Sequence, residues 1–242
     1  MDKKTIRQLN EINKEFYLKT QEYFNRTREF YWPGWEKLLP YFQGKTLKVL
    51  DVGCGNGRFG RFLEENNVKI KYVGMDNNEY LLNEAKKRLS KPRLINQDIY
   101  EDWKLKDKNF DAVMMLGLIH HVPGFENRVR LLKKSKSYLK KGGLLILSIW
   151  QFKKIKKFER KIIDWERFKK MAEVNIDMSQ LEKNDYILTW EKGIEAYRYC
   201  HFVNDEELKK ILSELKMELV DEFESDAKEK IGNGYVILKL AV

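Results

Sequence analysis

The amino-acid sequence predicts an α/β fold in which a mainly parallel sheet carries helices on both faces. Three observations predict it: short apolar runs alternate with amphipathic stretches between residues 47 and 147, glycines follow the first run, and 43% of the 242 residues are hydrophobic. Such a length fits one domain with appendages. We expect a helical extension at 1–44, a cofactor-binding core at 45–150, a basic insertion at 151–203 and a C-terminal helix with a strand pair at 204–242.

The first part of the chain is expected to be helical. Leu9, Ile12 and Phe16 recur near helical spacing, and Trp32-Pro33-Gly34 interrupts the pattern. In the core that follows, predicted strands alternate with predicted helices. Its apolar runs predict strands at 47–50, 72–75, 93–95, 112–116 and 144–147. Helix-spaced apolar residues predict helices at 59–66, 80–89 and 128–139.

Glycines and polar residues mark where the later elements begin and end. Gly142-Gly143 is expected to end the third helix of the core before the fifth strand. Residues 152–168 carry apolar side chains every three or four positions, which predicts one amphipathic helix with a cationic face. Asn204, with Glu207 three positions later, predicts a capped helix through Leu215. Two apolar stretches, 217–223 and 235–240, predict a closing antiparallel strand pair.

The net charge of +10 is concentrated in one part of the chain. Residues 128–141 hold seven Lys or Arg and no acid, and residues 151–170 hold nine bases and three acids. Such asymmetry suits an anionic partner, with nucleic acid first and an anionic membrane surface second. The alternative is that these side chains are the solvated faces of helices.

Nothing in the sequence indicates a membrane span, a secretory signal or a disulfide framework. The longest uncharged run, 112–125, is shorter than the about 18–20 apolar residues that a span needs. The N-terminus is charged, and Cys54 and Cys200 have no neighbouring Cys. We expect a cytoplasmic protein with reduced thiols and no metal site, since His120, His121 and His201 lack acidic or Cys companions at ligand spacing.

A glycine-rich loop between acidic residues is the strongest functional signal. The stretch Asp51-Val-Gly-Cys-Gly-Asn-Gly57 follows the first predicted strand and opens a helix. Asp76 ends the second strand, where a carboxylate can accept both hydroxyls of a ribose, and Asp98 follows the third, where it can accept an adenine amino group. A carboxylate at the head of the loop would repel a pyrophosphate and favours a cationic ligand. S-adenosylmethionine fits these partners.

These residues resemble the class I S-adenosylmethionine-dependent methyltransferases, through residues 51–57, Asp76, Asp98-Ile99 and Lys141-Gly142-Gly143. The resemblance implies a Rossmann-like sheet of seven strands with the last antiparallel. The residues then expected at the cofactor are Asp51, Gly53, Cys54, Gly55, Asn56, Gly57, Asp76, Asn77, Asp98, Ile99 and Leu116.

A narrower resemblance is to the tRNA wobble-uridine carboxymethyl methyltransferases, relatives of the methyltransferase domain of the AlkB-homologue tRNA enzymes. It is carried by residues 24–28 with Trp32-Pro33, and by 119–121, 148–150 and 197–202. It implies methylation of the carboxylate of 5-carboxymethyluridine in tRNA, and a small zinc-ribbon activator protein as a possible partner. At 233–236 the chain reads Asn-Gly-Tyr-Val and lacks the Trp that is common there in this family.

Under this reading the acceptor carboxylate is already ionised at neutral pH, so no general base is needed. Arg28 is predicted to hold it bidentately, and of the adjacent histidines only His121 is expected to face the substrate. Trp150 and Tyr197 are expected to wall in the nucleobase. The remaining residues expected to bind the substrate are His201, Lys153, Lys154, Lys156 and Lys157.

Two other functions stay open at this level. A small-molecule methyltransferase would use the N-terminal helices to shield an apolar substrate, and it leaves the basic stretch at 128–170 without a role. A non-catalytic RNA-binding module would keep the fold without turnover, and the intact acidic and glycine positions at 51–57, 76 and 98 argue against it.

Overall fold

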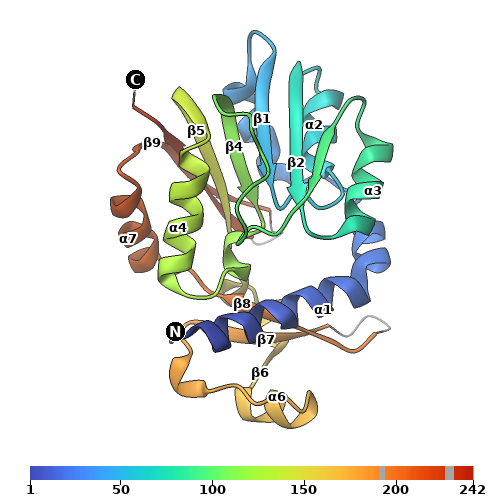
Figure 1. The fold of residues 1–242 in the computed structure, drawn as a ribbon, viewed down its shortest axis with the longest axis vertical. Coiled ribbons are helices and arrows are strands. Elements are labelled where there is room, and N and C mark those ends of the chain that lie inside the picture. Colours follow the sequence, from blue (N-terminus) through green and yellow to red (C-terminus); the bar gives the residue numbers. More distant parts are fainter. Residues whose placement is uncertain (191–193, 227–231, 242) are drawn as a thin grey trace.

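A seven-stranded sheet forms the centre of the molecule (Figure 1). The structure is a computed structural model that describes residues 1–190, 194–226 and 232–241. The strand order is β3-β2-β1-β4-β5-β10-β9, and β10 runs antiparallel to both of its neighbours. This confirms the predicted Rossmann-like sheet with its last strand antiparallel. The strands are β1 Leu47–Val52, β2 Ile70–Asp76, β3 Arg93–Asn96, β4 Phe110–Leu116, β5 Leu139–Trp150, β9 Glu218–Ser225 and β10 Asn233–Lys239.

Helices cover both faces of this sheet because successive strand residues point to opposite sides. On β4, Val113 and Met115 pack in one core with the helices α4 and α7, whereas Ala112 and Met114 pack in another with α2 and η1. The helices are α2 Arg58–Glu65, α3 Glu79–Arg88, α4 Phe125–Lys136, α7 Asp205–Leu215 and the 3-10 helices η1 Pro33–Phe42 and η2 Ile119–His121.

The helix α1, Lys3–Thr27, crosses the molecule between the large sheet and a smaller one (Figure 1). The smaller sheet, which we call the accessory sheet, consists of β6 Ile162–Ile163, β7 Asp185–Trp190 and β8 Ala196–His201. Leu9 and Ile12 of α1 pack with Ile187 and Tyr199 of the accessory sheet. The predicted N-terminal helical extension is therefore confirmed, and it forms a layer between two sheets.

The prediction of one amphipathic helix over 152–168 is wrong. The segment contains η3 Phe152–Lys154, α5 Lys156–Glu159, β6 and α6 Trp165–Met171, followed by η4 Met178–Gln180. Ile162 and Ile163 pair with β7 instead of continuing a helix. The Asp164 side chain then accepts hydrogen bonds from the amides of residues 166 and 167 and starts α6. The pairing of residues 162–163 with β7 therefore prevails over the helix that the spacing of apolar residues favours.

The role predicted for Gly142-Gly143 is also wrong. The helix α4 ends at Lys136, three residues before the predicted end, and both glycines lie inside β5. Gly142 has a φ of 70°, and the pairing of β5 with β4 shifts between Phe110 and Ala112. The glycines thus form an irregularity within the strand, where a positive φ favours glycine.

The closing elements follow the prediction. The Asn204 side chain accepts a hydrogen bond of 2.8 Å from the Glu207 amide at the start of α7. β9 and β10 form the expected antiparallel pair. Among the described residues, the helices are all too short or too polar to span a lipid bilayer.

Candidate active site

A cavity of about 920 Å³ lies between α1 and the carboxyl ends of the parallel strands. This is where ligands bind in open α/β sheets, and the volume suits a cofactor together with a substrate. The walls come from α1, the loop after β1, the ends of β2, β4 and β5, and the accessory sheet. The sheet edge lines one end, which we call the cofactor end, and the accessory sheet lines the other, the substrate end.

The glycine loop at the cofactor end is held in one conformation by backbone hydrogen bonds. Gly53, Gly55 and Gly57 all have positive φ, of 73°, 54° and 70°. The amide of Gly53 donates to the Met75 carbonyl at 2.7 Å. A side chain at Gly55 would project into open space, since nothing lies within 4 Å of its ideal Cβ position. The loop therefore leaves room for a ligand to approach its backbone closely.

Asp76 anchors this loop as well as facing the cavity. One of its carboxylate oxygens accepts from the Gly55 amide at 2.8 Å, and the other accepts from the Asn78 amide at 2.9 Å. Burial raises the pKa of Asp76. Asp98 accepts from the Tyr100 amide at 2.9 Å, with Asn77 beside it. Both aspartates keep acceptor capacity for a ligand, because a carboxylate offers about four lone-pair sites.

Asp51 lies deeper, where it is 3% exposed and accepts a hydrogen bond of 2.7 Å from the Tyr72 hydroxyl. Burial raises the pKa of Asp51 to about 7, and the charge of Asp76 adds to this effect. A buried carboxylate of this kind is stabilised by a cation. The cofactor end therefore suits a cationic ligand that carries hydroxyl groups, and it fits S-adenosylmethionine with its sulfonium, ammonium and ribose.

The C-terminal part of α1 is tied to the glycine loop through Asn25. The Asn25 side-chain oxygen accepts from Asn56 at 2.8 Å and from Arg88 at 2.9 Å, while its amide nitrogen donates to Glu84 at 3.0 Å. These bonds place Arg28, the residue after α1, at the cavity wall. The position of a substrate-end residue thus depends on the loop at the cofactor end.

The predicted catalytic and cofactor residues lie together around this cavity, with one exception. Those that line it are Arg28, His121, Asp51, Gly53, Cys54, Gly55, Asn56, Asp76, Asn77, Asp98, Ile99 and Leu116. Gly57 does not line the cavity but is packed underneath, where an added Cβ would lie 2.8 Å from Leu89 and 2.9 Å from Ala85. Its role is to shape the start of α2.

The two adjacent histidines differ from expectation, because both line the cavity. His121 Nδ1 lies 3.1 Å from the Tyr199 carbonyl, and its Nε2 lies 2.9 Å from the Tyr17 hydroxyl. The carbonyl requires a proton on Nδ1, so Nε2 accepts from Tyr17. Burial, with the charge of Arg198, lowers the pKa of His121 to about 3. His121 is a neutral wall residue without a free ring nitrogen for proton transfer.

His120 is better placed than His121 to contact a substrate. Its Nδ1 is buried and has no hydrogen-bond partner within the described ranges. Burial, together with His121 and Arg198, lowers the pKa of His120 well below its usual range. The His120 ring centroid lies 5.2 Å from that of Trp150, which also lines the cavity as predicted. The two rings form one wall of the substrate end.

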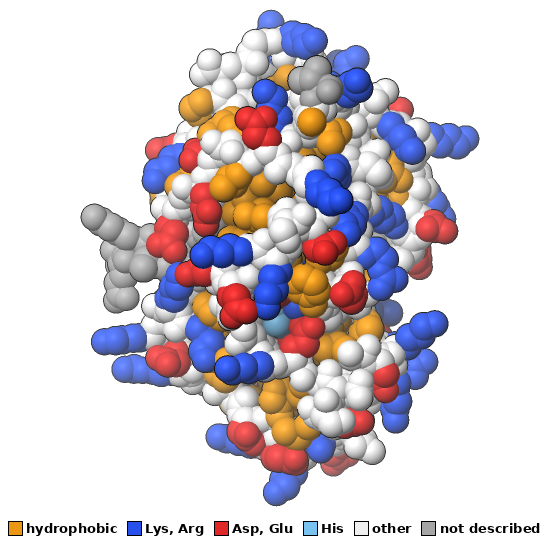
Figure 2. Space-filling view, turned by 90° about the vertical axis from the view of Figure 1, so that its left-hand side faces the viewer, with side chains coloured by type: hydrophobic (Ala, Val, Ile, Leu, Met, Phe, Trp, Pro, Cys, Tyr) orange, Lys and Arg blue, Asp and Glu red, His pale blue; other side chains and the backbone are white. Residues whose placement is uncertain are grey.

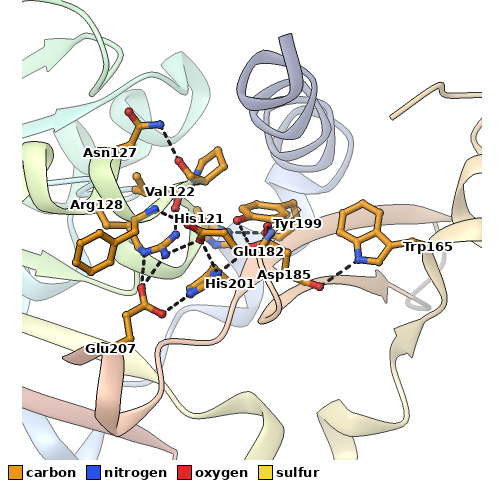
Figure 3. A network of polar contacts seen from close by, with 12 residues as sticks. His121, Val122, Asn127, Arg128, Trp165, Glu182, Asp185, Tyr199, His201 and Glu207 are labelled. Atoms are coloured by element: carbon orange, nitrogen blue, oxygen red, sulfur yellow. Dashed lines mark hydrogen bonds and ion pairs between the residues drawn. The ribbon is translucent and has the colours of Figure 1, made fainter. Parts of the chain in front are cut away.

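Two predicted substrate residues, Tyr197 and His201, lie outside the cavity lining. The Tyr197 ring packs on Phe168 with centroids 5.2 Å apart. His201 lies in a buried polar network (Figure 3), where Nδ1 is 2.7 Å from Asp185 and Nε2 is 2.6 Å from Glu207. Burial alone would lower the pKa of His201, but the hydrogen bonds to these two carboxylates raise it. Both residues stabilise the accessory sheet, so the expectation that they touch substrate is corrected.

Arg128 completes the network of Figure 3. Its guanidinium donates to Glu182 at 2.6 Å, to Glu207 at 2.8 Å and to the Val122 carbonyl at 2.9 Å. Three carboxylates thus meet the Arg128 guanidinium and the His201 imidazole here. The network joins α4, α7 and the accessory sheet to the segment directly after the two histidines, which positions those histidines.

Among the described residues, the structure brings together two groups of possible metal ligands that sequence spacing did not predict. Glu182, Asp185 and His201 form one group, and all three side chains already make hydrogen bonds within the network of Figure 3. His120, His121 and Cys200 form the other, with Cys200 Sγ 4.0 Å from His121 Nδ1. Burial raises the pKa of Cys200 to about 11, so it is a neutral thiol. We therefore assign the cavity to a cofactor and a substrate and not to a metal ion.

Several side chains of the basic stretch at 128–141 are engaged in contacts within the protein. Lys133 pairs with Glu214 at 2.6 Å, Lys136 donates to the Leu215 carbonyl at 2.7 Å, and Lys140 pairs with Asp111. Figure 2 shows the side of the molecule that carries α4 and α7, where Lys and Arg are interspersed with Asp and Glu. For this stretch the alternative of solvated helix faces is the better description.

The four lysines at 153–157 divide into two kinds. Lys153 donates to the Tyr186 hydroxyl at 2.8 Å, and Lys154 lies 3.4 Å from Glu224. Lys156 and Lys157 are exposed, and Lys157 also lines the substrate end of the cavity. Of the four, only this last lysine connects the basic surface with the cavity.

Sequence reasoning missed two residues of the substrate end, Tyr17 and Arg198. Tyr17 lies on α1 at the cavity wall, and its hydroxyl contacts His121. Arg198 comes from β8 and is 8% exposed. The sequence signal for Arg198 was present, because this residue lies inside the 197–202 motif, whereas Tyr17 lies in none of the motifs. The direction of Arg198 into the cavity depends on the pairing of β7 with β8.

Comparison with known proteins matches residues 50–147 to a family model described as a methyltransferase domain. A putative methyltransferase of Encephalitozoon cuniculi is 29% identical over 208 residues, which cover 85% of this chain and 87% of that protein. A structure of an S-adenosylmethionine-dependent methyltransferase from Clostridium acetobutylicum shares the fold, with a TM-score of 0.64 at 18% identity, covering 93% of this chain and 99% of that one.

Two further relatives carry tRNA in their names. The probable tRNA methyltransferase 9B of mouse is 27% identical over 62% of this chain, and the tRNA (carboxymethyluridine(34)-5-O)-methyltransferase ALKBH8 of mouse is 24% identical over 56%. This chain spans 33% of the first protein and 19% of the second.

Proposed function

We propose that this chain, a class I S-adenosylmethionine-dependent methyltransferase, methylates tRNA, and that its acceptor is the carboxylate of 5-carboxymethyluridine at the wobble position. The methyltransferase activity and the cofactor follow from the domain match and the relatives. The RNA and the modified group are our proposal.

One observation carries this proposal: acidic and basic side chains come from different walls of one cavity. Asp51, Asp76 and Asp98 stand around the glycine loop at the carboxyl ends of the strands, whereas Arg28 follows α1 and Arg198 comes from β8 of the accessory sheet. Arg58 at the start of α2 also lines the cavity, but its guanidinium donates to the Phe30 carbonyl and packs on Trp32 and Trp35. An acidic end favours a cationic cofactor, and a basic end favours an anionic acceptor. A carboxylate is the anion that matches a guanidinium bidentately.

The neutral histidines are consistent with an acceptor that needs no base. When bound, S-adenosylmethionine supplies an electrophilic methyl group on a sulfonium. The protein has to bring a carboxylate oxygen in line with that methyl group and exclude water, and such orientation can contribute several kcal/mol. Arg28 holds the carboxylate, while the Trp150 and His120 side chains form the wall beside the nucleobase. These roles correspond to side chains that line one cavity.

The tRNA relatives and the exposed lysines support an RNA substrate. Lys156 and Lys157 lie on the surface next to the substrate end, where the backbone of an anticodon loop would pass if its base entered the cavity. Enzymes that modify a base commonly extrude it into a pocket while basic residues hold the phosphates.

The test is mass spectrometry of nucleosides from the tRNA of a strain that lacks this gene, compared with its parent. We expect 5-carboxymethyluridine to accumulate and its methyl ester to disappear, and both changes to reverse when the gene is restored. Purified protein, alone and with a zinc-ribbon activator from the same organism, should then form the ester on that tRNA. An unchanged nucleoside profile would refute the proposed acceptor.

A further inference from the structure

The guanidinium of Arg198 lies at the substrate end and forms no ion pair with any residue that the structure describes. The residue is 8% exposed and lines the cavity. Its guanidinium carbon lies 4.6 Å from the ring centroid of Trp150 and 5.1 Å from that of Phe16. Its Nε atom is buried and has no hydrogen-bond partner in residues 1–190, 194–226 and 232–241. A buried donor that is left unsatisfied costs free energy unless a ligand completes it.

Arg198 contrasts with the other deeply buried arginine of this region, Arg128. Arg128 is fully buried and forms ion pairs of 2.6 and 2.7 Å with two glutamates. None of the ion pairs in the described part of the chain includes Arg198 or Arg28. The protein neutralises the charge of Arg128 itself, whereas among the described residues no carboxylate forms an ion pair with Arg28 or Arg198.

The charges of Arg28 and Arg198 act on the same part of the cavity. Burial lowers the pKa of Arg28, and the charge of Arg198 lowers it further. Both guanidiniums lie near Tyr17. Arg28 packs 4.4 Å from the Phe24 ring centroid, and Arg198 packs on Phe16; these two rings flank Tyr17 with centroids 5.3 and 5.1 Å from its own. Burial raises the pKa of Tyr17, and the two cations lower it. Two like charges held close together in a site of low polarity repel each other, and an anion placed between them relieves this repulsion.

We propose that Arg198 and Arg28 together form a two-guanidinium site for the acceptor carboxylate, and that loss of this charge on methylation releases the product. This inference rests on the proposed function. In the reaction one carboxylate oxygen forms a bond to the methyl carbon, and the bond from that carbon to sulfur breaks with its electron pair left on sulfur. No proton moves. The acceptor becomes a neutral ester, which no longer balances the two arginines.

An RNA phosphate would offer similar chemistry, but burial favours the carboxylate. Arg198 is 8% exposed and packs on the Trp150 ring, which lies beside His120, so an anion reaches it only from within the cavity, as the group on an extruded base would. A phosphate belongs to a continuous backbone and is more readily held at the exposed lysines. The site therefore distinguishes acid from ester at the base, and a phosphate contact would not.

The experiment measures binding of three synthetic anticodon stem-loops that differ only at the wobble base: 5-carboxymethyluridine, its methyl ester, and uridine. Titration calorimetry is done with S-adenosylhomocysteine present, so that no turnover occurs. We expect the wild-type protein to bind the acid about tenfold or more tightly than the ester, because a charge-assisted contact is lost. Arg198→Gln should bring the two affinities within about twofold of each other, and Arg198→Lys should give an intermediate ratio.

Arg7→Gln is the matched control. It removes the same charge from a residue that lines the same cavity, on the N-terminal half of α1. It should keep the wild-type ratio. A folded Arg198→Gln protein, judged by its melting temperature and its S-adenosylhomocysteine affinity, that still prefers the acid would overturn the inference. A uniform weakening of all three RNAs would assign Arg198 to a phosphate and overturn it too. If the wild-type protein itself does not distinguish acid from uridine, the proposed acceptor is wrong.

Discussion

The two ends of the cavity differ both in charge and in how the chain builds them. At the cofactor end Asp51, Asp76 and the glycine loop come from neighbouring strands. Asp76 accepts from the amides of Gly55 and Asn78, and Asp51 accepts from the Tyr72 hydroxyl. At the substrate end Arg28 and Arg198 come from α1 and β8, and the described residues offer them no carboxylate. The acids are held in place by hydrogen bonds within the protein before a cationic ligand binds, whereas Arg28 and Arg198 have no ion pair among the described residues. We therefore expect an anionic ligand to be needed to balance the charge of the substrate end.

The largest expected effect separates turnover from cofactor binding. Arg28→Gln should lower turnover on tRNA by about 100-fold or more, since removal of one preorganised contact to the reacting group commonly costs about 10²–10³ in rate. Arg28→Lys should retain part of the activity, because a point charge does not reproduce the bidentate fork. Single-turnover methylation with radiolabelled cofactor measures both.

S-adenosylmethionine affinity should stay unchanged in both Arg28 variants. Arg26→Gln is the control, as Arg26 is exposed on the same helix and outside the cavity. Wild-type turnover in Arg28→Gln would remove this residue from the mechanism and leave the contrast between the two ends without support.

The second prediction concerns the cofactor end alone. Asp76→Ala should weaken S-adenosylmethionine binding by about 1.5–3 kcal/mol, through lost hydrogen bonds to the ribose and a less restrained Gly55. Asp102→Ala, at an exposed acid outside the cavity, should leave the affinity unchanged. Calorimetric titration decides between the outcomes, and an Asp76→Ala protein that binds normally would show that this carboxylate does not reach the ribose.

The third prediction is a pH dependence that belongs to the cofactor end. The pKa of Asp51 is raised to about 7, so this carboxyl becomes protonated in the free protein as the pH falls below that value. A cationic ligand needs the ionised form, and its affinity should therefore fall by up to about tenfold per pH unit between pH 7 and 5. Asp51→Asn should bind more weakly at pH 8 and lose this slope. An equal slope in the variant would assign the pH dependence to another group.

The two histidines at the substrate end should add no pH dependence to the methylation rate. The pKa of His121 is lowered to about 3 and that of His120 is also lowered, so both stay neutral from pH 6 to 8. With cofactor saturating, methylation should be level across this range if the acceptor is a carboxylate.

The smallest expected effect concerns the surface beside the substrate end. Each phosphate contact contributes about 0.7–0.9 to the slope of log affinity against log salt. Lys156→Gln with Lys157→Gln should lower that slope for tRNA, because both side chains are exposed. The matched pair Lys133→Gln and Lys136→Gln, whose ammonium groups already contact Glu214 and the Leu215 carbonyl, should change it less. Equal slopes in the two double variants would leave the basic insertion without a role in RNA binding.

Local sequence predicted the cofactor end well because its signals are short-range. The strand at 47–52 leads directly into glycines with positive φ, and Asp76 ends the next strand along the chain. Parallel strands bring their carboxyl ends to one edge, so these residues meet once the sheet forms. The same reasoning failed at 152–168, because strand pairing of Ile162 and Ile163 with β7 replaced the helix that their spacing favoured.

The sequence by itself determined the α/β sheet, the glycine loop, the acids that face a cationic cofactor and the excess of positive charge. Only the tertiary structure decided which charged side chains face the cavity. Arg128 and His201 lie inside a satisfied network, while Arg198, on the same strand as His201, lies against Trp150 at the cavity wall. Charge and residue type can be read from the chain, but the partners that neutralise a buried charge come from distant segments. Their presence or absence decides whether an arginine is structural or available to a ligand.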